Sequence, residues 1–292
     1  MAAYGPTTNH GRGIDLHAHT TASDGDHSPT QLVAHAADLG LAAVGVTDHD
    51  TIDGVAEALE AGKRYGIEVI PGVELSVQIS HGQFHLLGYL IDPEAGELAG
   101  RLRQLRENRA RRNRLMIEKL HGLGLDISLE EVSAIAGGEV VARPHFARAL
   151  LAKGYVSTTQ EAFDRYLADG AAGHVHKDKL NAEEAIALVH SAGGLAILAH
   201  PNNLKRDEAE TAEEIARMQS LGLDGIEARY SRHTPEDTAR YLALAERRGL
   251  LTTGGSDFHG PTVKPNIRLG HVEGEKAAPY DLLDALRQAR ST

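Results

Sequence analysis

Short apolar segments alternate with helical segments at both ends of the chain, and this alternation constrains the fold more than any other feature. Repeated strand–helix units with short turns predict a largely parallel α/β sheet, open or closed into a barrel. The expected strands cover residues 13–16, 42–46, 67–74, 195–199, 225–229 and 250–254, and segments 75–78 and 84–90 flank Ser-His-Gly as a hairpin. The expected helices cover residues 28–40, 53–65, 208–221 and 235–249. In the first of them Ser28 is the expected N-cap, Pro29 the first helical residue and Gly40 the end of the helix.

The middle of the chain has a different pattern. From about Gly96 to Lys179 the strand signals disappear and helical signals dominate, with a long Arg-rich helix expected from about Leu98 to Leu123. We therefore predict an α/β domain formed by residues 1–98 and 182–292, interrupted by an all-helical insert (cap) domain over residues 99–181.

Composition excludes several classes of protein. The 292 residues include no cysteine, which excludes a disulfide framework, a thiolate metal site and a cysteine nucleophile. A net charge of -11 and only 4% aromatic residues argue against a binder of long duplex nucleic acid. Segment 1–12 resembles neither an export nor a transit signal, and no apolar run is long enough to span a membrane. We expect a cytoplasmic protein without membrane partners.

The 17 histidines point to the chemistry, because many of them follow strands together with acidic residues. In a parallel barrel the carboxyl ends of the strands meet on one face, where such folds build their sites. Residues i and i+2 of an extended segment point the same way, so each His-x-His or Asp-x-His pair can bind one ion. The residues concerned are His17, His19, Asp24, His49, Glu74, His200, Asp257 and His259.

Imidazole and carboxylate ligands suit Mn, Zn, Fe or Co. One such residue at a strand end is more often a cap or a turn residue, but five strand ends with the same ligand types indicate a metal site. Eight ligands exceed the needs of one ion, so the set predicts at least two metals with Glu74 as a bridge. Two ions about 3.5–4 Å apart are the usual arrangement for phosphoester cleavage.

The ordered motifs resemble the PHP (polymerase and histidinol phosphatase) family over residues 13–95 and 182–292. They are His-x-His, Thr-Asp-His-Asp, Pro-Gly-Val-Glu, Ala-His-Pro and Ser-Asp-Phe-His. The resemblance implies a distorted (β/α)7 TIM-like barrel with an all-helical insertion and two or three divalent ions, most often Mn. The eight residues above match the family's ligand positions, with Asp24 where some members carry His. His85 matches a ninth position; spacing alone leaves it either a packing residue or a ligand of a third ion.

The insert resembles a stand-alone branch of this family. The best match in that branch hydrolyses the 3'-phosphate of nucleoside 3',5'-bisphosphates to nucleoside 5'-monophosphates, and related members trim short 5'-phosphorylated oligonucleotides. We therefore expect a phosphoric monoester hydrolase that acts on a small nucleotide. The expected nucleophile is a metal-bridging hydroxide held by Glu74 and Asp257, and no Ser, Cys or Lys nucleophile is required. One ion is assigned to His17, His19, Glu74 and Asp257, and the other to Asp24, His49, His200 and His259.

Substrate contacts are expected from basic residues. The run 101–114 is strongly basic within an acidic protein, and is either a solvated helix face or a surface for a second phosphate. Segment 143–145 opens another helix with free backbone N–H groups beside cationic side chains, and segment 229–233 follows a strand. The candidate residues are Arg103, Arg106, Arg143, His145, Arg229 and His233.

Three alternatives remain open. The first is a 5'-to-3' exonuclease on short 5'-phosphorylated RNA or DNA, within the same family. The second is a metal-dependent amidohydrolase, although such enzymes usually need a carboxylated lysine or a lone strand-end aspartate, and no expected strand ends in lysine. The third is a non-catalytic metal-binding module, against which the full ligand set argues because an inert module need not keep open coordination positions.

Overall fold

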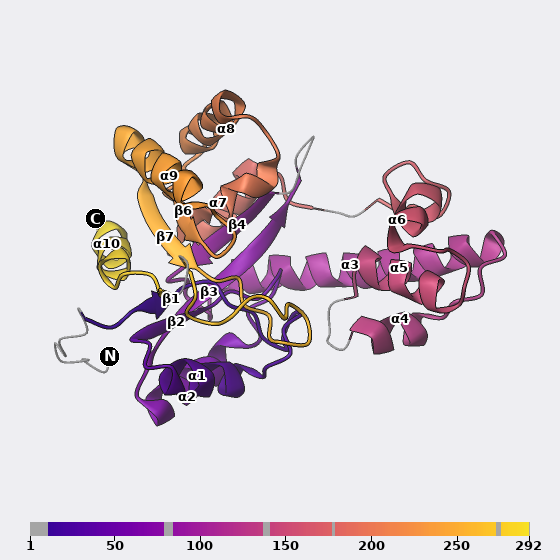
Figure 1. Cartoon of the computed structure of the whole chain (residues 1–292), viewed down its shortest axis with the longest axis horizontal. Coiled ribbons are helices and arrows are strands. Elements are labelled where there is room, and N and C mark those ends of the chain that lie inside the picture. The colour runs from indigo at the N-terminus through magenta and orange to yellow at the C-terminus, as the bar shows by residue number, and fades with distance from the viewer. Residues whose placement is uncertain (1–10, 79–83, 137–140, 177–178, 273–275, 292) are drawn as a thin grey trace. The chain divides into compact units, whose positions relative to one another are not determined.

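The computed structural model describes residues 11–78, 84–136, 141–176, 179–272 and 276–291 (Figure 1). The chain divides into two compact units, which are described separately. The first unit comprises residues 1–99 and 180–292, and the second comprises residues 100–179.

The first unit contains seven strands and their connecting helices. The strands are β1 (Ile14–Asp15), β2 (Ala43–Val46), β3 (Glu68–Val77), β4 (Phe84–Tyr89), β5 (Leu195–Leu198), β6 (Gly225–Tyr230) and β7 (Leu251–Gly255). The helices are α1 (Pro29–Asp38), α2 (Val55–Tyr65), α7 (Ala182–Ser191), the 3-10 helix η2 (Pro201–Leu204), α8 (Glu208–Ser220), α9 (Pro235–Arg248) and α10 (Asp281–Arg290).

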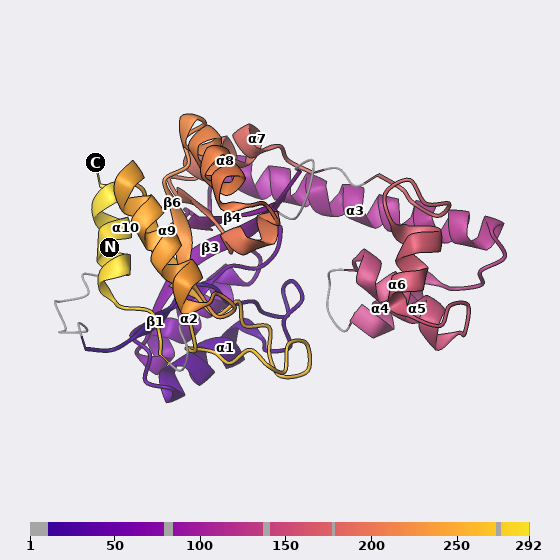
Figure 2. The ribbon, with the colours of Figure 1, turned by 45° about the horizontal axis from the view of Figure 1, so that its top comes forward.

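The strands form one sheet in the order β1 to β7, and neighbouring pairs are parallel except where β4 runs antiparallel to both β3 and β5. The two ends of the sheet meet, because the Leu16 amide donates to the Gly254 carbonyl at 3.1 Å and the Asp257 amide to the His17 carbonyl at 2.9 Å. Figure 2 shows the strands between α1 and α2 on one side and α7 to α9 on the other. The predicted distorted seven-stranded barrel is confirmed.

Local signals explain where the helices begin and end. Ser28 caps α1 by accepting a hydrogen bond from the Gln31 amide at 3.2 Å, and the Gln31 side chain accepts from the Ser28 amide at 2.8 Å. Replacing such a cap with alanine typically costs about 1 kcal/mol. Past the end of this helix, Gly40 adopts φ 74°, which a residue with a side chain rarely does.

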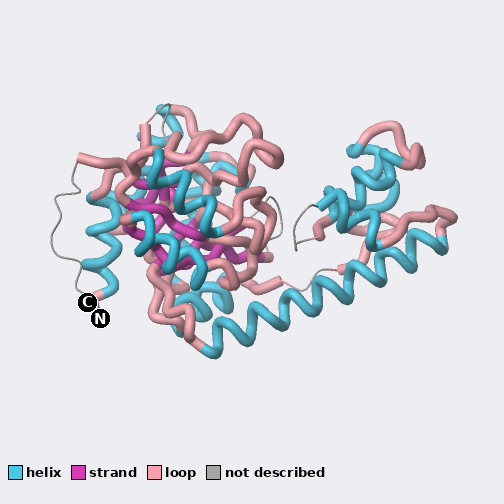
Figure 3. The backbone as a smooth tube through the Cα atoms, turned by 90° about the horizontal axis from the view of Figure 1, so that it is seen from below, coloured by secondary structure: helices cyan, strands magenta, loops and turns pink. Residues whose placement is uncertain are grey.

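Two apolar clusters pack the barrel strands and their helical covering. One buried cluster joins strand residues such as Ile14 and Ile197 to Leu283 of α10. A second, which includes Leu32 and Val44, packs α1 and α2 on the sheet. Figure 3 shows the strands surrounded by helices within this unit. The polar strand ends are thus held by a rigid framework.

The second unit is all-helical over its described residues. The helix α3 (Gly96–Gly122) begins in the first unit, and α4 (Leu129–Ala136), α5 (Arg143–Ala152), α6 (Thr159–Ala162) and the π-helix η1 (Phe163–Leu167) follow it. An apolar core that includes Met116, Leu120, Phe146 and Leu150 joins them. Among the described residues, none of the helices of either unit has the length and apolar character needed to span a membrane.

The structure differs from the sequence prediction at three places. The break expected after Glu74 is absent: β3 runs without interruption through both predicted segments, while the Ser-His-Gly turn lies outside the described residues. The antiparallel pairing predicted for the hairpin segments is confirmed between β3 and β4, but β4 also pairs antiparallel with β5, which was not predicted. The helices α7 and α10 were not predicted.

Candidate metal centre

The polar residues predicted from the strand ends gather at one end of the barrel. His17 and His19 follow β1, His49 follows β2, and Asp257 and His259 follow β7. Glu74 lies within β3, where its amide donates to the Asp48 carbonyl at 3.2 Å and its carbonyl accepts from the Asp50 amide at 2.9 Å. These backbone bonds hold the loop after β2 against β3, and so bring His49 to Glu74.

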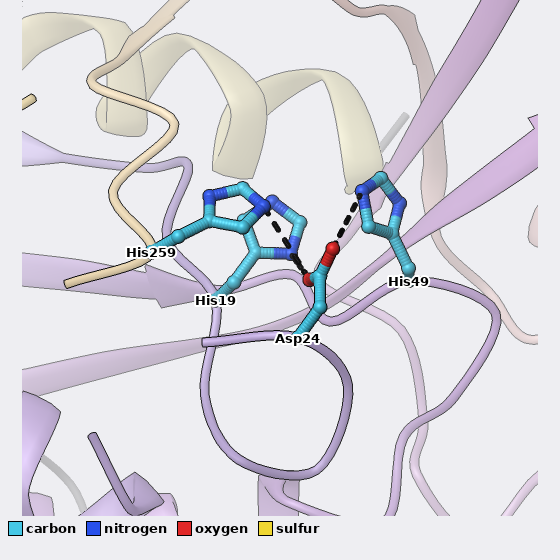
Figure 4. A group of neighbouring side chains, drawn as sticks. All are labelled: His19, Asp24, His49 and His259. Atoms are coloured by element: carbon cyan, nitrogen blue, oxygen red, sulfur yellow. Dashed lines mark ion pairs between the residues drawn. The ribbon is translucent and has the colours of Figure 1, made fainter. Parts of the chain in front are cut away.

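The donor atoms form three groups, and within each group they all lie within 4.8 Å of one another. The first group combines an aspartate with three histidines, whose side chains point toward one another in Figure 4. The groups share Glu74, His19 and His49, so they form one continuous centre. They consist of His19, Asp24, His49 and His259; His17, His19, Glu74 and Asp257; and His49, Glu74 and His85.

Glu74 is the common element of this centre, and its side chain is fully buried. Its Oε2 atom lies 3.1–3.3 Å from ring nitrogens of His17, His19 and His49. Its Oε1 atom lies 2.8 Å from His85 Nδ1 and 2.9 Å from His200 Nε2. One carboxylate therefore faces five imidazole rings, an arrangement suited to a bridging ligand.

All nine predicted metal ligands thus lie at the centre, with one difference in grouping. His200 was assigned with Asp24, His49 and His259, whereas its Nε2 atom approaches Glu74 and His19 takes the place beside Asp24. Asp24 Oδ1 lies 3.7 Å from His19 Nδ1 and 3.4 Å from His259 Nε2. The reason is geometric, because His19 reaches both groups with its two ring nitrogens.

Several donor atoms are buried and lack a hydrogen-bond partner. They are His17 Nε2, both ring nitrogens of His19, His49 Nδ1 and Glu74 Oε2. A buried polar atom without a partner is costly, and here the atoms converge on shared points between nitrogen and oxygen donors. Divalent cations placed among them would satisfy all of these atoms, so the residues present fit a metal centre.

The protonation tendencies of the acidic residues agree with this role. Burial opposes the charged form of Asp24, but the charges of His49, His259 and His19 outweigh it and lower the Asp24 pKa to about 2. Burial likewise opposes ionisation of Glu74, and the charges of His49, His85 and His17 hold its pKa well below the usual value. Both carboxylates are therefore in the ionised form that a cation requires.

The histidines fall into two classes. Burial lowers the pKa of His49 to about 4, and burial with the charge of His19 lowers that of His259 to about 3, so both rings favour the neutral form that binds metals. Burial also acts against charge on His19, but the close carboxylates of Asp257 and Glu74, whose oxygens lie 3.3 and 3.2 Å from Nε2, prevail and raise its pKa to about 9. The carboxylates around His19 therefore attract a positive charge, which a metal would supply in place of a proton.

Three of the five non-glycine residues with positive φ in the described part of the chain lie at this centre. His200 has φ 27° and ψ 68°, Asp257 has φ 60°, and Asp50 beside His49 has φ 53°. Residues other than glycine seldom adopt such angles, and they persist where surrounding bonds impose them, commonly at functional sites. The strain places the His200 and Asp257 side chains toward the donor groups.

The residues that support the donor side chains were not predicted from the sequence. The Oδ2 atom of Asp257 accepts hydrogen bonds from Lys264 Nζ at 2.7 Å and from the Tyr230 hydroxyl at 3.0 Å, so Oδ1 is the atom that faces the imidazoles. Glu227 contacts both His17 and His200. Its sequence signal, an acidic residue inside the apolar segment Ile226-Glu227-Ala228, is weak because such a residue can also face solvent.

The loop that carries Asp24 is held in a similar way. The buried Asp48 carboxylate holds this loop in place. Its Oδ1 atom accepts hydrogen bonds from the Thr20 amide at 2.7 Å and from the Ser23 hydroxyl at 2.6 Å. The same carboxylate accepts from the Thr20 hydroxyl through Oδ2 at 2.7 Å. Asp48 therefore supports the loop, while the neighbouring His49 supplies a donor.

The predicted substrate residues occupy both units. In the first unit, Arg229 lies in β6, and the His233 ring lies 5.2 Å from the Tyr230 ring, which is itself 5.4 Å from His200. In the second unit, Arg143 Nη1 binds Asp169 at 2.6 Å and His145 Nδ1 accepts from the Ala142 amide at 3.1 Å. Arg103 and Arg106 lie in α3. Their contact with substrate stays a prediction.

Comparison with known proteins finds relatives along most of the chain. A sequence profile of the PHP domain matches residues 15–220. The 3',5'-nucleoside bisphosphate phosphatase of Chromobacterium violaceum is 35% identical over 261 residues, which cover 89% of this chain and 91% of the relative. The 5'-3' exoribonuclease Rnm of Escherichia coli is 35% identical over 265 residues, which cover 90% of each protein.

Two solved structures share the fold at similar identity. One is named an amidohydrolase, from Chromobacterium violaceum; it is 33% identical with a TM-score of 0.78, over 95% of this chain and 96% of that chain. The other, from Bifidobacterium adolescentis, is a predicted metal-dependent phosphoesterase; it is 31% identical with a TM-score of 0.77, over 98% of both chains. The likeness therefore includes the barrel and the helical insert.

Proposed function

The chain belongs to the PHP domain family and is a metal-dependent phosphoesterase, and we propose that it hydrolyses the 3'-phosphate of nucleoside 3',5'-bisphosphates to leave nucleoside 5'-monophosphates. The observation that carries the proposal is the continuous centre of three donor groups around the buried Glu74. Such a centre suits a reaction in which negative charge must be neutralised at both the attacking and the leaving oxygen.

The proposed cofactors are two or three divalent ions, with Mn first and Zn, Fe or Co as alternatives. Ions bound here would lower the pKa of water toward neutrality and offset the charge of the phosphate oxygens. The proposed ligands are the nine residues named above, with Glu74 and Asp257 beside the reacting water. Their imidazole and carboxylate atoms match the preferences of these metals.

The chain's own residues would orient the reacting groups. Asp257 is held by Lys264 and Tyr230, so its Oδ1 atom has a defined position 3.3 Å from His19 Nε2. The Lys264 side chain is about one-quarter exposed, and its ammonium group lies 2.7 Å from Asp257 Oδ2. A fixed cation beside the metal ligands would add to the attraction for an anionic substrate.

The preference for a bisphosphate is supported by two observations. The Chromobacterium violaceum relative bears that activity in its name and matches 89% of this chain. The helix α3 carries many arginines, among them Arg103 and Arg106, in a protein of net charge -11. Arginine suits a second, non-reacting phosphate because its planar fork binds phosphate oxygens in pairs.

A second candidate is a 5'-to-3' exonuclease on short 5'-phosphorylated oligonucleotides. The Escherichia coli exoribonuclease is 35% identical to this chain over 90% of its length, the same identity as the phosphatase relative. The two activities differ in the bond that is broken, since one releases inorganic phosphate and the other releases a nucleotide.

The deciding experiment compares products from one panel. Purified protein loaded with Mn is incubated with adenosine 3',5'-bisphosphate, a 5'-phosphorylated RNA trinucleotide and an N-acyl amino acid, and the products are identified by mass. We expect phosphate and adenosine 5'-monophosphate from the first substrate at the highest kcat/KM. Faster release of mononucleotides from the trinucleotide would favour the exonuclease, and cleavage of the amide alone would refute both candidates.

A further inference from the structure

The strand β6 contains an irregularity next to the metal centre. Its pairing with β7 shifts between Glu227, opposite Thr253, and Arg229, opposite Gly254, so Ala228 is an extra residue. Side chains alternate between the two faces of a regular strand, which would place Glu227 and Tyr230 on opposite faces. The extra residue of the bulge shifts the alternation, so that Glu227 and Tyr230 lie on the same face. Glu227 then contacts His17, and Tyr230 contacts Asp257.

Glu227 lies beneath two of the ligands with its side chain fully buried. Its Oε1 atom is 2.9 Å from His17 Nδ1, and its Oε2 atom accepts a hydrogen bond from the His200 amide at 2.8 Å. Each carboxylate oxygen therefore has one partner, and each partner belongs to a different ligand residue.

The contact with His17 decides which ring nitrogen carries the proton. An ionised carboxylate can only accept hydrogen bonds, so His17 Nδ1 must be the donor. In a neutral ring, Nε2 then presents its lone pair, and this atom faces Glu74 Oε2 at 3.3 Å and Asp257 Oδ1 at 3.6 Å. Three electron-rich atoms that face one another repel, and a cation between them would replace this repulsion with attraction.

The contact with His200 stabilises a strained backbone. His200 has φ 27° and ψ 68°, a conformation that residues other than glycine seldom adopt. The bond from its amide to Glu227 offsets part of that strain. Asn203 Nδ2 lies 3.0 Å from His200 Nδ1, and His200 Nε2 lies 2.9 Å from Glu74 Oε1.

We propose that Glu227 is a positioning residue of the metal centre: it sets the tautomer of His17 and holds His200 toward Glu74. A ligand histidine commonly donates its second N–H to a carboxylate, and loss of that partner typically weakens metal binding by about 10- to 100-fold. The inference rests on the proposed metal centre and is independent of the proposed substrate.

The test uses Glu227→Gln, which preserves the size of the side chain. An amide has one accepting oxygen and one donating NH2 group. Because the oxygen must face the His200 amide to avoid two opposed N–H groups, the NH2 group would donate to His17 Nδ1. The proton of His17 would then move to Nε2, the atom that faces the other ligands. Glu214→Gln is the matched control, since Glu214 is also a buried glutamate but binds Arg206 and Arg217.

Two measurements read the effect without a nucleotide substrate. Zinc affinity is measured by competition with a chromophoric chelator, and we expect E227Q to bind about 10- to 100-fold more weakly while E214Q stays within about twofold of wild type. The ring of His17 is observed by 15N NMR of the zinc-loaded protein. We expect a proton on Nδ1 in wild type and E214Q, and its loss in E227Q.

Circular dichroism and thermal melting establish that the variants are folded. A folded E227Q protein with wild-type zinc affinity and a proton on His17 Nδ1 would overturn the proposal. The wild-type spectrum is a test that needs no substitution: a proton on His17 Nε2 in the zinc-loaded protein would also refute it, even if E227Q failed to fold. Inactivity of the wild-type enzyme toward bisphosphates would contradict only the proposed function.

Discussion

Replacing His85 with alanine should remove one metal ion and leave the fold intact. Among the described residues, His85 contributes to a single donor group, with His49 and Glu74. The substitution leaves this group with two donors, and both of them also serve other groups. The other two groups each keep four donors. We therefore expect metal content to fall from about three ions per chain to about two, because structural and catalytic sites rarely hold an ion with fewer than three protein ligands.

The structure also explains why the fold should survive this change. The His85 side chain is about one-fifth exposed, so its loss opens no closed cavity in the core. The strand pairing of His85 with Ser76 and the bond from the Ala199 amide to the His85 carbonyl involve only the backbone. The Oε1 atom of Glu74 keeps His200 as a partner.

The assay is metal content by mass spectrometry after saturation with Mn and removal of free ions, with circular dichroism as the measure of folding. His190→Ala is the matched control, because His190 lies on α7 and pairs with Asp224. Equal metal content in wild type and H85A, with both proteins folded, would refute the reasoning. His85 would then be a packing residue, and the centre would hold two ions.

Three further predictions concern other parts of the molecule. Asp257→Asn should lower turnover of a bisphosphate by at least ~10²-fold, since a charge at the reacting atoms is lost. With Asp284→Asn as the control, near-wild-type turnover of the metal-saturated D257N enzyme would exclude this role. Arg106→Ala should raise KM for a bisphosphate more than for an aryl phosphate, in contrast to Arg101→Ala, and equal changes would contradict a second-phosphate contact. His190→Gln should reduce the free energy of unfolding by about 0.3–0.5 kcal/mol at about pH 5.5, with little effect at about pH 9. The measurement is urea denaturation in the presence of a metal chelator. A loss of stability that does not depend on pH would contradict this prediction.

The sign of the His190 prediction follows from its partner. The hydrogen bond to Asp224 raises the pKa of His190 above its ordinary value of 6.5. The charged ring therefore stabilises the folded protein below this value, and the contribution disappears as the pH rises through the raised pKa. Because the side chain is more than one-third exposed, water screens the pair and the effect is small.

Most residues of the three donor groups could be predicted because they lie at strand ends. A strand such as 42–46 has a strong apolar signal, and the polar residues that end it then stand out, as His49 does. The supporting residues carry no such signal. Lys264 lies 7 residues beyond Asp257 in a loop, and only the folded loop brings its Nζ atom to the Asp257 carboxylate. Sequence spacing cannot show a contact that depends on the path of a loop.

The direction of β4 explains why the role of His85 was the most difficult to predict. A rule based on parallel strands looks for ligands where a strand ends, but His85 is the second residue of its strand. Because β4 runs antiparallel to β3 and β5, its beginning lies at the same end of the barrel as the ends of its neighbours: Phe84 pairs with Val77, and Leu86 pairs with Leu198. His85 and Glu74 are consequently diagonal neighbours on adjacent strands, within reach of a long side chain. The first residues of a reversed strand in a mixed barrel therefore lie at the site. A histidine there is as strong a candidate for metal binding as a histidine at the end of a parallel strand.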